Sequence, residues 1–293
     1  MISAVIPTFR GAARLERYLP SVRESLGAAG EPFEIIVVDD GGGGLPELGR
    51  HVTVERLPAN RGYAPAMNAG IARARGEWLL ILNDDVRLER ETVGRLRACF
   101  PQEHLFAAVP SILSRLASCG DEGGKIARWE AGLLEIMERP GGATRSTLYP
   151  VGCCALCPRE SLAALGGFAE VYAPFFWEDV ELGYRAWRRG WRVLHVPEAV
   201  CHHEGSATLR SEYAEAERDR VWFRNRVLFH LRNLQEPSRR AAFLGALAAF
   251  VMLDPRDTRR QAVSEALERH SVDPGEPWAG LDDTEILHRV AFT

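Results

Sequence analysis

Three short apolar runs, residues 4–7, 33–38 and 78–82, punctuate the first part of the chain. Buried strands of a parallel sheet have such nearly continuous apolar sequences, often rich in β-branched residues. Residues with helical spacing of apolar side chains lie between the runs, at 15–26 and again at 63–75. Residues 52–57 alternate like a strand nearer an edge. This order predicts an α/β fold with a doubly wound, mostly parallel sheet flanked by helices.

The rest of the chain divides by composition. Residues 111–149 are rich in glycine and turn residues and give no clear pattern, whereas 151–157 and 191–196 favour strands and 158–165 and 178–189 favour helices. From residue 212 onward the sequence is charged and helical, and its first part, up to residue 240, has seven arginines at 218, 220, 224, 226, 232, 239 and 240. We expect three parts: 1–110, 111–210, and a helical C-terminal extension over 211–293.

Composition excludes several classes of protein. A net charge of −4 gives no basic field for binding nucleic acid. The N-terminus enters a strand pattern directly, without the basic and apolar regions of a signal peptide, and the longest apolar stretch, 241–253, is shorter than the roughly twenty residues that span a bilayer. Six cysteines, one of them Cys119, are too few for a disulfide scaffold. We therefore expect a cytoplasmic protein with reduced thiols.

Acidic residues cluster at two places where this fold would bind a ligand. Asn83-Asp84-Asp85 follows the third apolar run, and Glu178-Asp179 opens a predicted helix. Carboxylates at the C-terminal ends of parallel strands face the ligand crevice, where a pair can hold a divalent cation against a diphosphate. The alternatives are an N-cap for the first cluster, which accounts for one carboxylate rather than two, and complementation of the helix dipole for the second.

These clusters belong to a longer series of segments. In order, the series is residues 4–10, 35–41, 60–64 with Asn68 and Gly70, 82–86, 166–168, 176–182 and 202–206. It resembles the inverting glycosyltransferases of family 2, which have the GT-A fold, and most closely the bacterial rhamnosyltransferase-like branch. The resemblance runs from residue 4 to about residue 206 of 293. It implies that 1–110 is the nucleotide-sugar-binding half and 111–210 the acceptor-binding and catalytic half.

The resemblance also assigns residues to the donor. Asp40 would accept the imide N–H of uracil or thymine, with Pro7 and Thr8 shaping the base and ribose pocket. Asp84 would contact the ribose or the sugar. Arg61 would contact the diphosphate, although a plain surface arginine is an equal alternative, and Asn68 is either a donor contact or a helix-packing amide.

A second set of assignments concerns the cation and the chemistry. Asp85 would bind Mg²⁺ or Mn²⁺, with His202 preferred over His203 to complete the metal shell. Asp179 would be the catalytic base. Glu178, Trp177 and His203 would have secondary or acceptor-side roles, with core packing as the alternative for Trp177.

The resulting hypothesis is metal-dependent, inverting transfer of a sugar from a UDP- or dTDP-sugar to a hydroxyl of a glycan or lipid-linked acceptor. A sugar-phosphate nucleotidyltransferase would carry a glycine-rich loop with Arg and Lys after the first strand, and residues 7–11 do not. A catalytically silent scaffold protein that binds nucleotide sugars is the alternative; loss of Asp85 or Asp179 would mark it, and both are present.

Two features of the C-terminal half remain open. The arginine-rich extension either rests on the inner face of an anionic membrane or, as we prefer, packs its apolar side on the catalytic domain. Cys154 and Cys157 have the spacing of half a zinc site, but no second pair completes four ligands.

Overall fold

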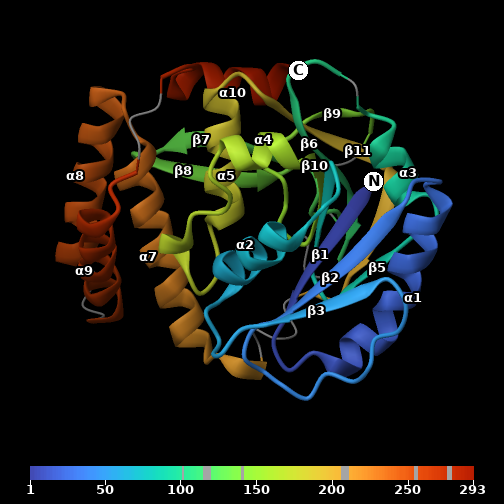
Figure 1. The fold of residues 1–293 in the computed structure, drawn as a ribbon. Coiled ribbons are helices and arrows are strands. Elements are labelled where there is room, and N and C mark those ends of the chain that lie inside the picture. Colours follow the sequence, from blue (N-terminus) through green and yellow to red (C-terminus); the bar gives the residue numbers. More distant parts are fainter. Residues whose placement is uncertain (101, 115–119, 140–141, 206–210, 254–256, 276–278) are drawn as a thin grey trace.

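The computed structural model describes residues 1–100, 102–114, 120–139, 142–205, 211–253, 257–275 and 279–293. Its centre is a nine-stranded mixed sheet in the order β3-β2-β1-β4-β10-β6-β11-β5, with β9 added alongside β11 (Figure 1). The strands are β1 (Ile2–Thr8), β2 (Phe33–Asp39), β3 (Val52–Arg56), β4 (Trp78–Leu82), β5 (Val86–Leu88), β6 (Leu105–Leu113), β9 (Arg145–Ser146), β10 (Cys154–Pro158) and β11 (Arg192–His203).

The first four strands form the parallel part of the sheet. β1 pairs with β2 on one side and β4 on the other, so Ile2 lies opposite both Phe33 and Trp78. Helix α1 (Ala12–Ala28) covers one face and α2 (Tyr63–Arg73) packs on β1 and β2 from the other (Figure 1). From β1 the strand order runs outward through β2 to β3, and the chain then returns to place β4 on the other side of β1. The C-terminal ends of β1 and β4 therefore flank a topological switch point, where ligands bind in such sheets.

The other strands are largely antiparallel to their neighbours. β10 runs antiparallel to both β4 and β6, while β11 runs parallel to β6 with a register shift between Val196 and Val200. Helices α3 (Thr92–Arg97), α4 (Arg159–Ala164) and α5 (Glu178–Arg188) and the 3₁₀ turn η1 (Glu170–Tyr172) connect these strands. The predicted α/β architecture is confirmed, and β6 is a central strand that the sequence pattern did not predict.

The segment without a clear sequence pattern contains a β-hairpin. β7 (Lys125–Glu130) and β8 (Leu133–Glu138) pair antiparallel through a turn in which both Ala131 and Gly132 have positive φ, 48° and 80°. Such a two-residue turn matches the twist of the flanking strands. The hairpin stands apart from the main sheet, beside the C-terminal helices (Figure 1).

The C-terminal extension is helical, as expected. It comprises α7 (Glu215–Asn233), α8 (Pro237–Leu253), α9 (Asp257–Val272) and α10 (Asp283–Phe292). Val227, Leu228 and Phe229 of α7 are fully buried and belong to the same hydrophobic core as the sheet. The preferred packing of the extension on the catalytic domain is thus observed for α7. The expected boundary near residue 210 lies outside the described residues, as do Ser206 and Cys119.

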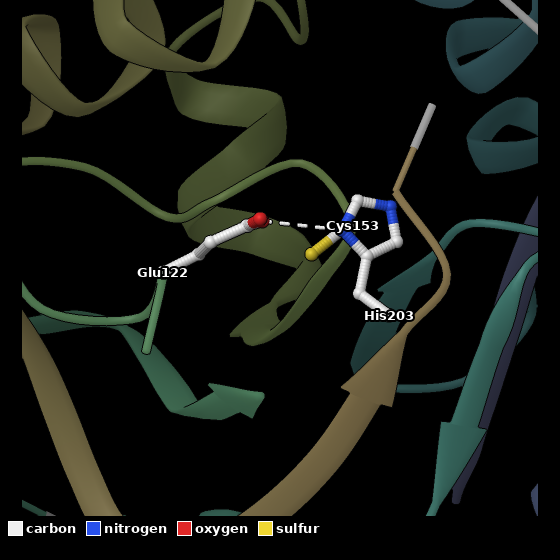
Figure 2. A group of neighbouring side chains, drawn as sticks. All are labelled: Glu122, Cys153 and His203. Carbon is white, nitrogen blue, oxygen red and sulfur yellow. Dashed lines mark hydrogen bonds and ion pairs between the residues drawn. The ribbon is translucent and has the colours of Figure 1, made fainter. Parts of the chain in front are cut away.

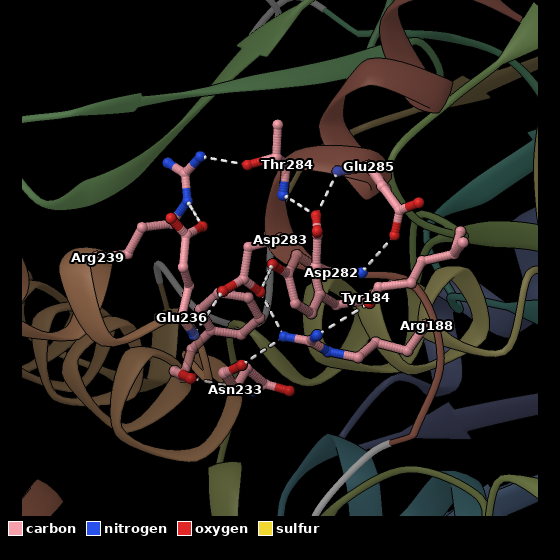
Figure 3. A network of polar contacts seen from close by, with 11 residues as sticks. Tyr184, Arg188, Asn233, Glu236, Arg239, Asp282, Asp283, Thr284 and Glu285 are labelled. Atoms are coloured by element: carbon pink, nitrogen blue, oxygen red, sulfur yellow. Dashed lines mark hydrogen bonds and ion pairs between the residues drawn. The ribbon is translucent and has the colours of Figure 1, made fainter.

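A buried polar network ties α10 to α5 (Figure 3). Arg188, near the end of α5, pairs with Asp283, whose carboxylate also accepts a 2.6 Å hydrogen bond from Tyr184. The guanidinium donates further to the carbonyl oxygens of Asn233 and Leu281. Since a buried charge needs a partner and hydrogen bonds, this network fixes how the last helix docks. In the described part of the chain, no helix combines the length and apolar character needed to cross a membrane.

Candidate active site

A pocket of ≈ 550 Å³ opens at the switch point, between the parallel strands, the β7–β8 hairpin and helix α7. Nine of the residues singled out in the sequence line it, and these are Pro7, Thr8, Asp40, Asp84, Asp85, Trp177, Glu178, Asp179 and His203. Three do not, namely Arg61, Asn68 and His202. Trp222 and Arg226 of α7 also line the pocket, so the C-terminal extension forms one of its walls.

Asp84 is locked in place by two neighbours. The guanidinium of Arg14 donates from Nε and Nη2 to the two carboxylate oxygens of Asp84, both at 2.9 Å, and the Thr8 hydroxyl donates to Oδ2. Burial raises the pKa of Asp84, although Arg14 and Thr8 act in the opposite direction. A Cβ at Gly11 would lie 2.1 Å from Asp84 Oδ2, so this contact requires glycine at that position. The sequence analysis missed Arg14, whose only signal is its place in the first turn of the helix after β1.

Asp40 anchors the turn that leads into α2. Its two oxygens accept the backbone N–H groups of Arg61 (2.8 Å) and Gly62 (2.9 Å), and Gly62 has a φ of 90° that favours glycine. Burial raises the pKa of Asp40 against these hydrogen bonds. Each carboxylate oxygen has a second lone pair, and Asp40 still faces the pocket.

The side chains of Arg61 and Asn68 contact a neighbouring loop. Arg61 forms an exposed ion pair with Glu170 at 3.1 Å. Asn68 exchanges hydrogen bonds with the backbone of Phe168, donating to its carbonyl oxygen at 2.9 Å and accepting from its N–H at 3.0 Å. These contacts fit the surface-arginine and helix-packing alternatives, and a donor contact for either side chain stays a prediction.

The two consecutive histidines at the end of β11 have different surroundings. His203 Nε2 lies 3.3 Å from Asp85 Oδ1, and its side chain is 9% exposed. His202 Nε2 lies 2.8 Å from Glu89 Oε1, and its side chain is 38% exposed. Successive side chains of a strand point to opposite faces, so only one of the two reaches the pocket. The structure thus places His203, rather than the preferred His202, beside Asp85, and the histidine that completes the metal shell stays a prediction.

His203 is held between two carboxylates. Its Nδ1 lies 3.1 Å from Glu122 Oε2 (Figure 2), whereas its Nε2 is the nitrogen that lies beside Asp85. Burial alone would lower the pKa of His203, but hydrogen bonds to Asp85 and Glu122 outweigh it and raise that pKa to about 9. The sequence analysis missed Glu122, because it lies in the segment without a readable pattern.

The peptide that leads into α5 is unusual. Phe176 and Trp177 both adopt left-handed φ angles, 75° and 74°, directly before Glu178. The side-chain amide of Asn225, on α7, lies within hydrogen-bonding distance of three carbonyl oxygens of this loop, those of Tyr172 (2.6 Å), Phe175 (2.8 Å) and Phe176 (2.9 Å). Non-glycine residues occupy this region only where the surroundings enforce it, and Asn225 is such an enforcing contact.

Asp179 is oriented entirely by backbone groups. Its Oδ2 accepts from Gly152 N at 3.0 Å and its Oδ1 from Val180 N at 2.8 Å, while Tyr63 donates to the Gly152 carbonyl oxygen and steadies that peptide. Burial raises the pKa of Asp179. A carboxylate whose pKa moves toward neutrality is a better general base at neutral pH.

Glu178 lies beside Asp179, and in the described part of the chain its carboxylate lacks comparable hydrogen bonds. The residue is buried, and its Oε2 has no hydrogen-bond partner. Burial, followed by the charge of Asp179, raises the pKa of Glu178 well above its usual value. The two backbone N–H groups that donate to Asp179 favour the charged form of that carboxylate, whereas Oε2 of Glu178 has no such donor among the described residues.

Other expected residues are structural. Trp177 is buried against Phe229, with ring centroids 5.2 Å apart, so it joins the core as well as lining the pocket. Cys154 and Cys157 lie three residues apart on β10, where strand alternation points them to opposite faces. They do not form a chelating pair.

Family comparison identifies the fold and its relatives. A model described as glycosyl transferase family 2 matches residues 3–166, more than half of the chain, and a model of glycosyl transferase family group 2 matches residues 128–256. The chain belongs to glycosyl transferase family 2. A relative in Mycobacterium tuberculosis, the pre-mycofactocin glycosyltransferase, is 29% identical over 219 residues, which cover 71% of this chain but only 44% of the relative.

A second family member from the same organism is matched more fully. The N-acetylglucosaminyl-diphospho-decaprenol L-rhamnosyltransferase is 28% identical over 250 residues, 72% of this chain and 78% of that protein. This agrees with the rhamnosyltransferase-like branch indicated by the sequence motifs.

Solved structures share the fold of this chain. GalNAc-T7 with UDP, GalNAc and Mn²⁺ superposes with a TM-score of 0.69 at 18% identity, over 100% of this chain and 56% of that one. Staphylococcus aureus TarS with UDP-GlcNAc gives 0.58 at 16% identity, over 92% and 81%. The chain has the GT-A fold.

Proposed function

We propose that this family 2 protein is an inverting glycosyltransferase that moves a sugar from a UDP- or dTDP-sugar to a hydroxyl of a glycan or lipid-linked acceptor. The observation that carries the proposal is the joint lining of one pocket by Asp85 with His203 and by Asp179. A donor diphosphate and an attacking hydroxyl need these two kinds of group within one enclosed space.

The nucleotide would bind over the ends of β1 and β2. Pro7, Thr8 and Asp40 line the pocket. Asp40, with a free lone pair on each oxygen, would accept the imide N–H that uracil and thymine share. Asp84, already neutralised by Arg14, would face the ribose or sugar hydroxyls without repelling the diphosphate.

Asp85 and His203 would hold the divalent cation. A carboxylate oxygen suits Mg²⁺ and Mn²⁺, and Nε2 of His203 lies 3.3 Å from Asp85 Oδ1, so the two side chains can each offer one ligand atom to the same cation. When bound, Mg²⁺ or Mn²⁺ would offset the charge that develops on the departing diphosphate. Solved GT-A structures, among them the Pyrobaculum calidifontis mannosyltransferase with GDP-Man, contain Mn²⁺.

Asp179 would act as the base. It takes the proton of the acceptor hydroxyl as the hydroxyl oxygen bonds to the anomeric carbon, while the bond from that carbon to the phosphate oxygen breaks on the opposite face. The configuration inverts, and the nucleoside diphosphate leaves with the bonding electrons. Gly152 N and Val180 N keep the Asp179 carboxylate fixed during this step.

The acceptor side would include a membrane surface. The outer face of α8 is exposed and apolar, with Leu244 at 47% and Met252 at 79% exposure, and Arg240 lies exposed near the helix start. An apolar helix face with arginine beside it suits an anionic lipid surface, where a lipid-linked acceptor would reside. Flotation with anionic and neutral vesicles, comparing the unmodified chain with Leu244→Glu, tests this contact.

A thermal-shift screen of UDP, dTDP, GDP and CDP, each with and without Mn²⁺, tests the donor site. Ligands that bind the folded state raise the melting temperature. We expect metal-dependent stabilisation by UDP or dTDP, and its loss in Asp85→Asn and His203→Ala. His202→Ala is the matched control and should retain it.

If none of the four nucleotides raises the melting temperature, the donor site is refuted and the catalytically silent scaffold protein is favoured. Binding without turnover in a screen of lipid-linked and free glycan acceptors would refute transfer to those acceptors while leaving the donor site intact.

A further inference from the structure

Glu122, Cys153 and His203 line the pocket and come together from three separate segments (Figure 2). Glu122 precedes β7, Cys153 precedes β10, and His203 ends β11. One ligand atom from each lies within 4.8 Å of the other two. Within the described ranges, this is the group of three such side chains close enough to hold one metal ion.

The two ring nitrogens of His203 face different partners. Nε2 faces Asp85 at 3.3 Å, and Nδ1 faces Glu122 at 3.1 Å. Asp85 offers only hard oxygen ligands, which suit Mg²⁺ or Mn²⁺, whereas Cys153 adds a sulfur that prefers zinc and other thiophilic cations. One imidazole thus borders two cation environments of different chemistry.

We propose that Glu122, Cys153 and His203 Nδ1 form a second cation site that binds Zn²⁺, with a pocket water as fourth ligand. Three protein ligands plus water is an ordinary zinc arrangement. Binding would release the Cys153 proton, and the proton on His203 Nδ1 would move to Nε2 or to solvent. Nothing in the proposed transfer reaction uses Cys153, so the thiol is left without a role by that reaction.

Hydrogen bonds of Asp121 hold the loop that carries Glu122. Asp121, next to Glu122, accepts hydrogen bonds from the backbone N–H groups of Ile112 and Gly123 at 2.8 Å and from the Ser111 hydroxyl at 2.6 Å. These contacts fix the loop that carries Glu122. Because ligands held on rigid supports bind metals without reorganisation, the three side chains need to move little.

Occupation of this site would exclude the hard cation from His203. A neutral imidazole bound to metal through Nδ1 carries its proton on Nε2, and that N–H then points at Asp85 as a donor. His203 therefore serves one cation at a time. This consequence rests on the proposed function, whereas the zinc site itself does not.

Cobalt substitution and zinc titration of the full chain test the site directly. Co²⁺ bound to a thiolate gives a near-ultraviolet charge-transfer band, and a chromophoric chelator in competition reports the Zn²⁺ affinity. We expect the band in the unmodified chain and in Cys157→Ser, a matched buried cysteine outside the pocket. In Cys153→Ser the band should vanish and Zn²⁺ affinity fall by at least about 100-fold, since even outer-shell changes cost 10–100-fold.

An unchanged affinity in Cys153→Ser, or a cobalt complex without the thiolate band, would overturn the proposal. If Cys153→Ser fails to fold, Glu122→Gln with the same two readouts replaces it.

Electron paramagnetic resonance of free Mn²⁺ separates the zinc site from the proposed function. Zn²⁺ should displace bound Mn²⁺ from the unmodified chain at concentrations at which Cys153→Ser retains its Mn²⁺, since only direct competition at Asp85 and His203 is left in the variant. A thiolate band with no Mn²⁺ binding would uphold the zinc site and refute the cation of the transfer reaction. Mn²⁺ binding that Zn²⁺ fails to displace would refute the shared histidine.

Discussion

Both ends of helix α5 carry buried ionisable side chains, which in the described part of the chain have an ion-pair partner at the C-terminal end and none at the first two residues of the helix. At the C-terminal end, Arg188 pairs with Asp283 and donates to carbonyl oxygens, so positive and negative charge cancel (Figure 3). At the N-terminal end, Glu178 and Asp179 lie side by side, and in the described part of the chain neither has an ion-pair partner.

The paired charges at one end of α5 serve stability, and the unpaired carboxylates at the other end would serve chemistry. A cancelled charge network contributes to holding elements together, but it cannot accept a proton without disrupting its own contacts. An uncancelled carboxylate pair destabilises the fold, and for the same reason it is ready to take a proton. The helix that α10 holds at one end presents the candidate base at the other.

Asp179→Asn tests the N-terminal end of α5 and should have the largest effect of the substitutions described below. Removing the base should lower kcat by about 10²–10⁴-fold, while nucleotide binding in the thermal-shift assay stays intact. The melting temperature should change little, because removing a buried charge offsets the loss of one of the two backbone hydrogen bonds that Asp179 accepts. A kcat within a few-fold of the unmodified chain would move the role of base to another residue.

Asp283→Ala tests the C-terminal end of α5, where the charges of Arg188 and Asp283 cancel. It leaves Arg188 buried without its partner, which costs about 3–5 kcal/mol of unfolding free energy. The neighbouring Asp282 is the control: it is the N-cap of α10, so Asp282→Ala should cost about 1 kcal/mol. Urea denaturation measures both, and equal losses would contradict the distinct role given to the buried pair.

Asn225→Ala tests whether the extension positions the base. Losing contacts to three carbonyl oxygens should destabilise the chain by about 1–3 kcal/mol, and kcat should fall by about tenfold as Asp179 loses its fixed position. Asn233→Ala, a buried amide on the same helix that donates to one carbonyl oxygen of α7, should lose stability without this fall in kcat. Parallel losses of kcat in both variants would indicate a general structural effect.

Glu178→Gln should have the smallest effect and the opposite sign for stability. The raised pKa means that folded Glu178 stays protonated at pH values where the unfolded chain ionises it, so its contribution to stability is lost as pH rises through that range. The amide should therefore stabilise the chain by about 0.5–2 kcal/mol at neutral pH, and the gain should disappear below the ordinary pKa of glutamate. Thermal unfolding across pH measures it; a gain that persists in acid would contradict the raised pKa.

Local sequence determined the parallel part of the fold well. The runs at 4–7, 33–38 and 78–82 are apolar because both faces of β1, β2 and β4 are covered, and that burial is visible residue by residue. The β7–β8 hairpin escaped prediction because its strands are only partly buried and mix charged with apolar residues. Its exposure removed the periodicity on which a prediction depends.

The candidate site followed a similar division. Residues attached to motifs at strand ends, such as Thr8, Asp40 and Asp85, reach the pocket because the sheet topology carries them there. Arg14, Glu122 and Asn225 act through contacts between distant segments, which no local pattern reveals. The choice between His202 and His203 depended on strand register, and a shift of one residue reverses which side chain faces inward.

The way Asn225 grips its loop has a consequence for how such a protein can vary. Its amide contacts main-chain oxygens of Tyr172, Phe175 and Phe176, and these oxygens are the same whatever side chains the loop carries. The loop can therefore exchange its side chains during evolution or design while keeping its course into α5. Such a lock would let a common scaffold acquire new acceptor preferences without rebuilding the position of the residue that takes the proton.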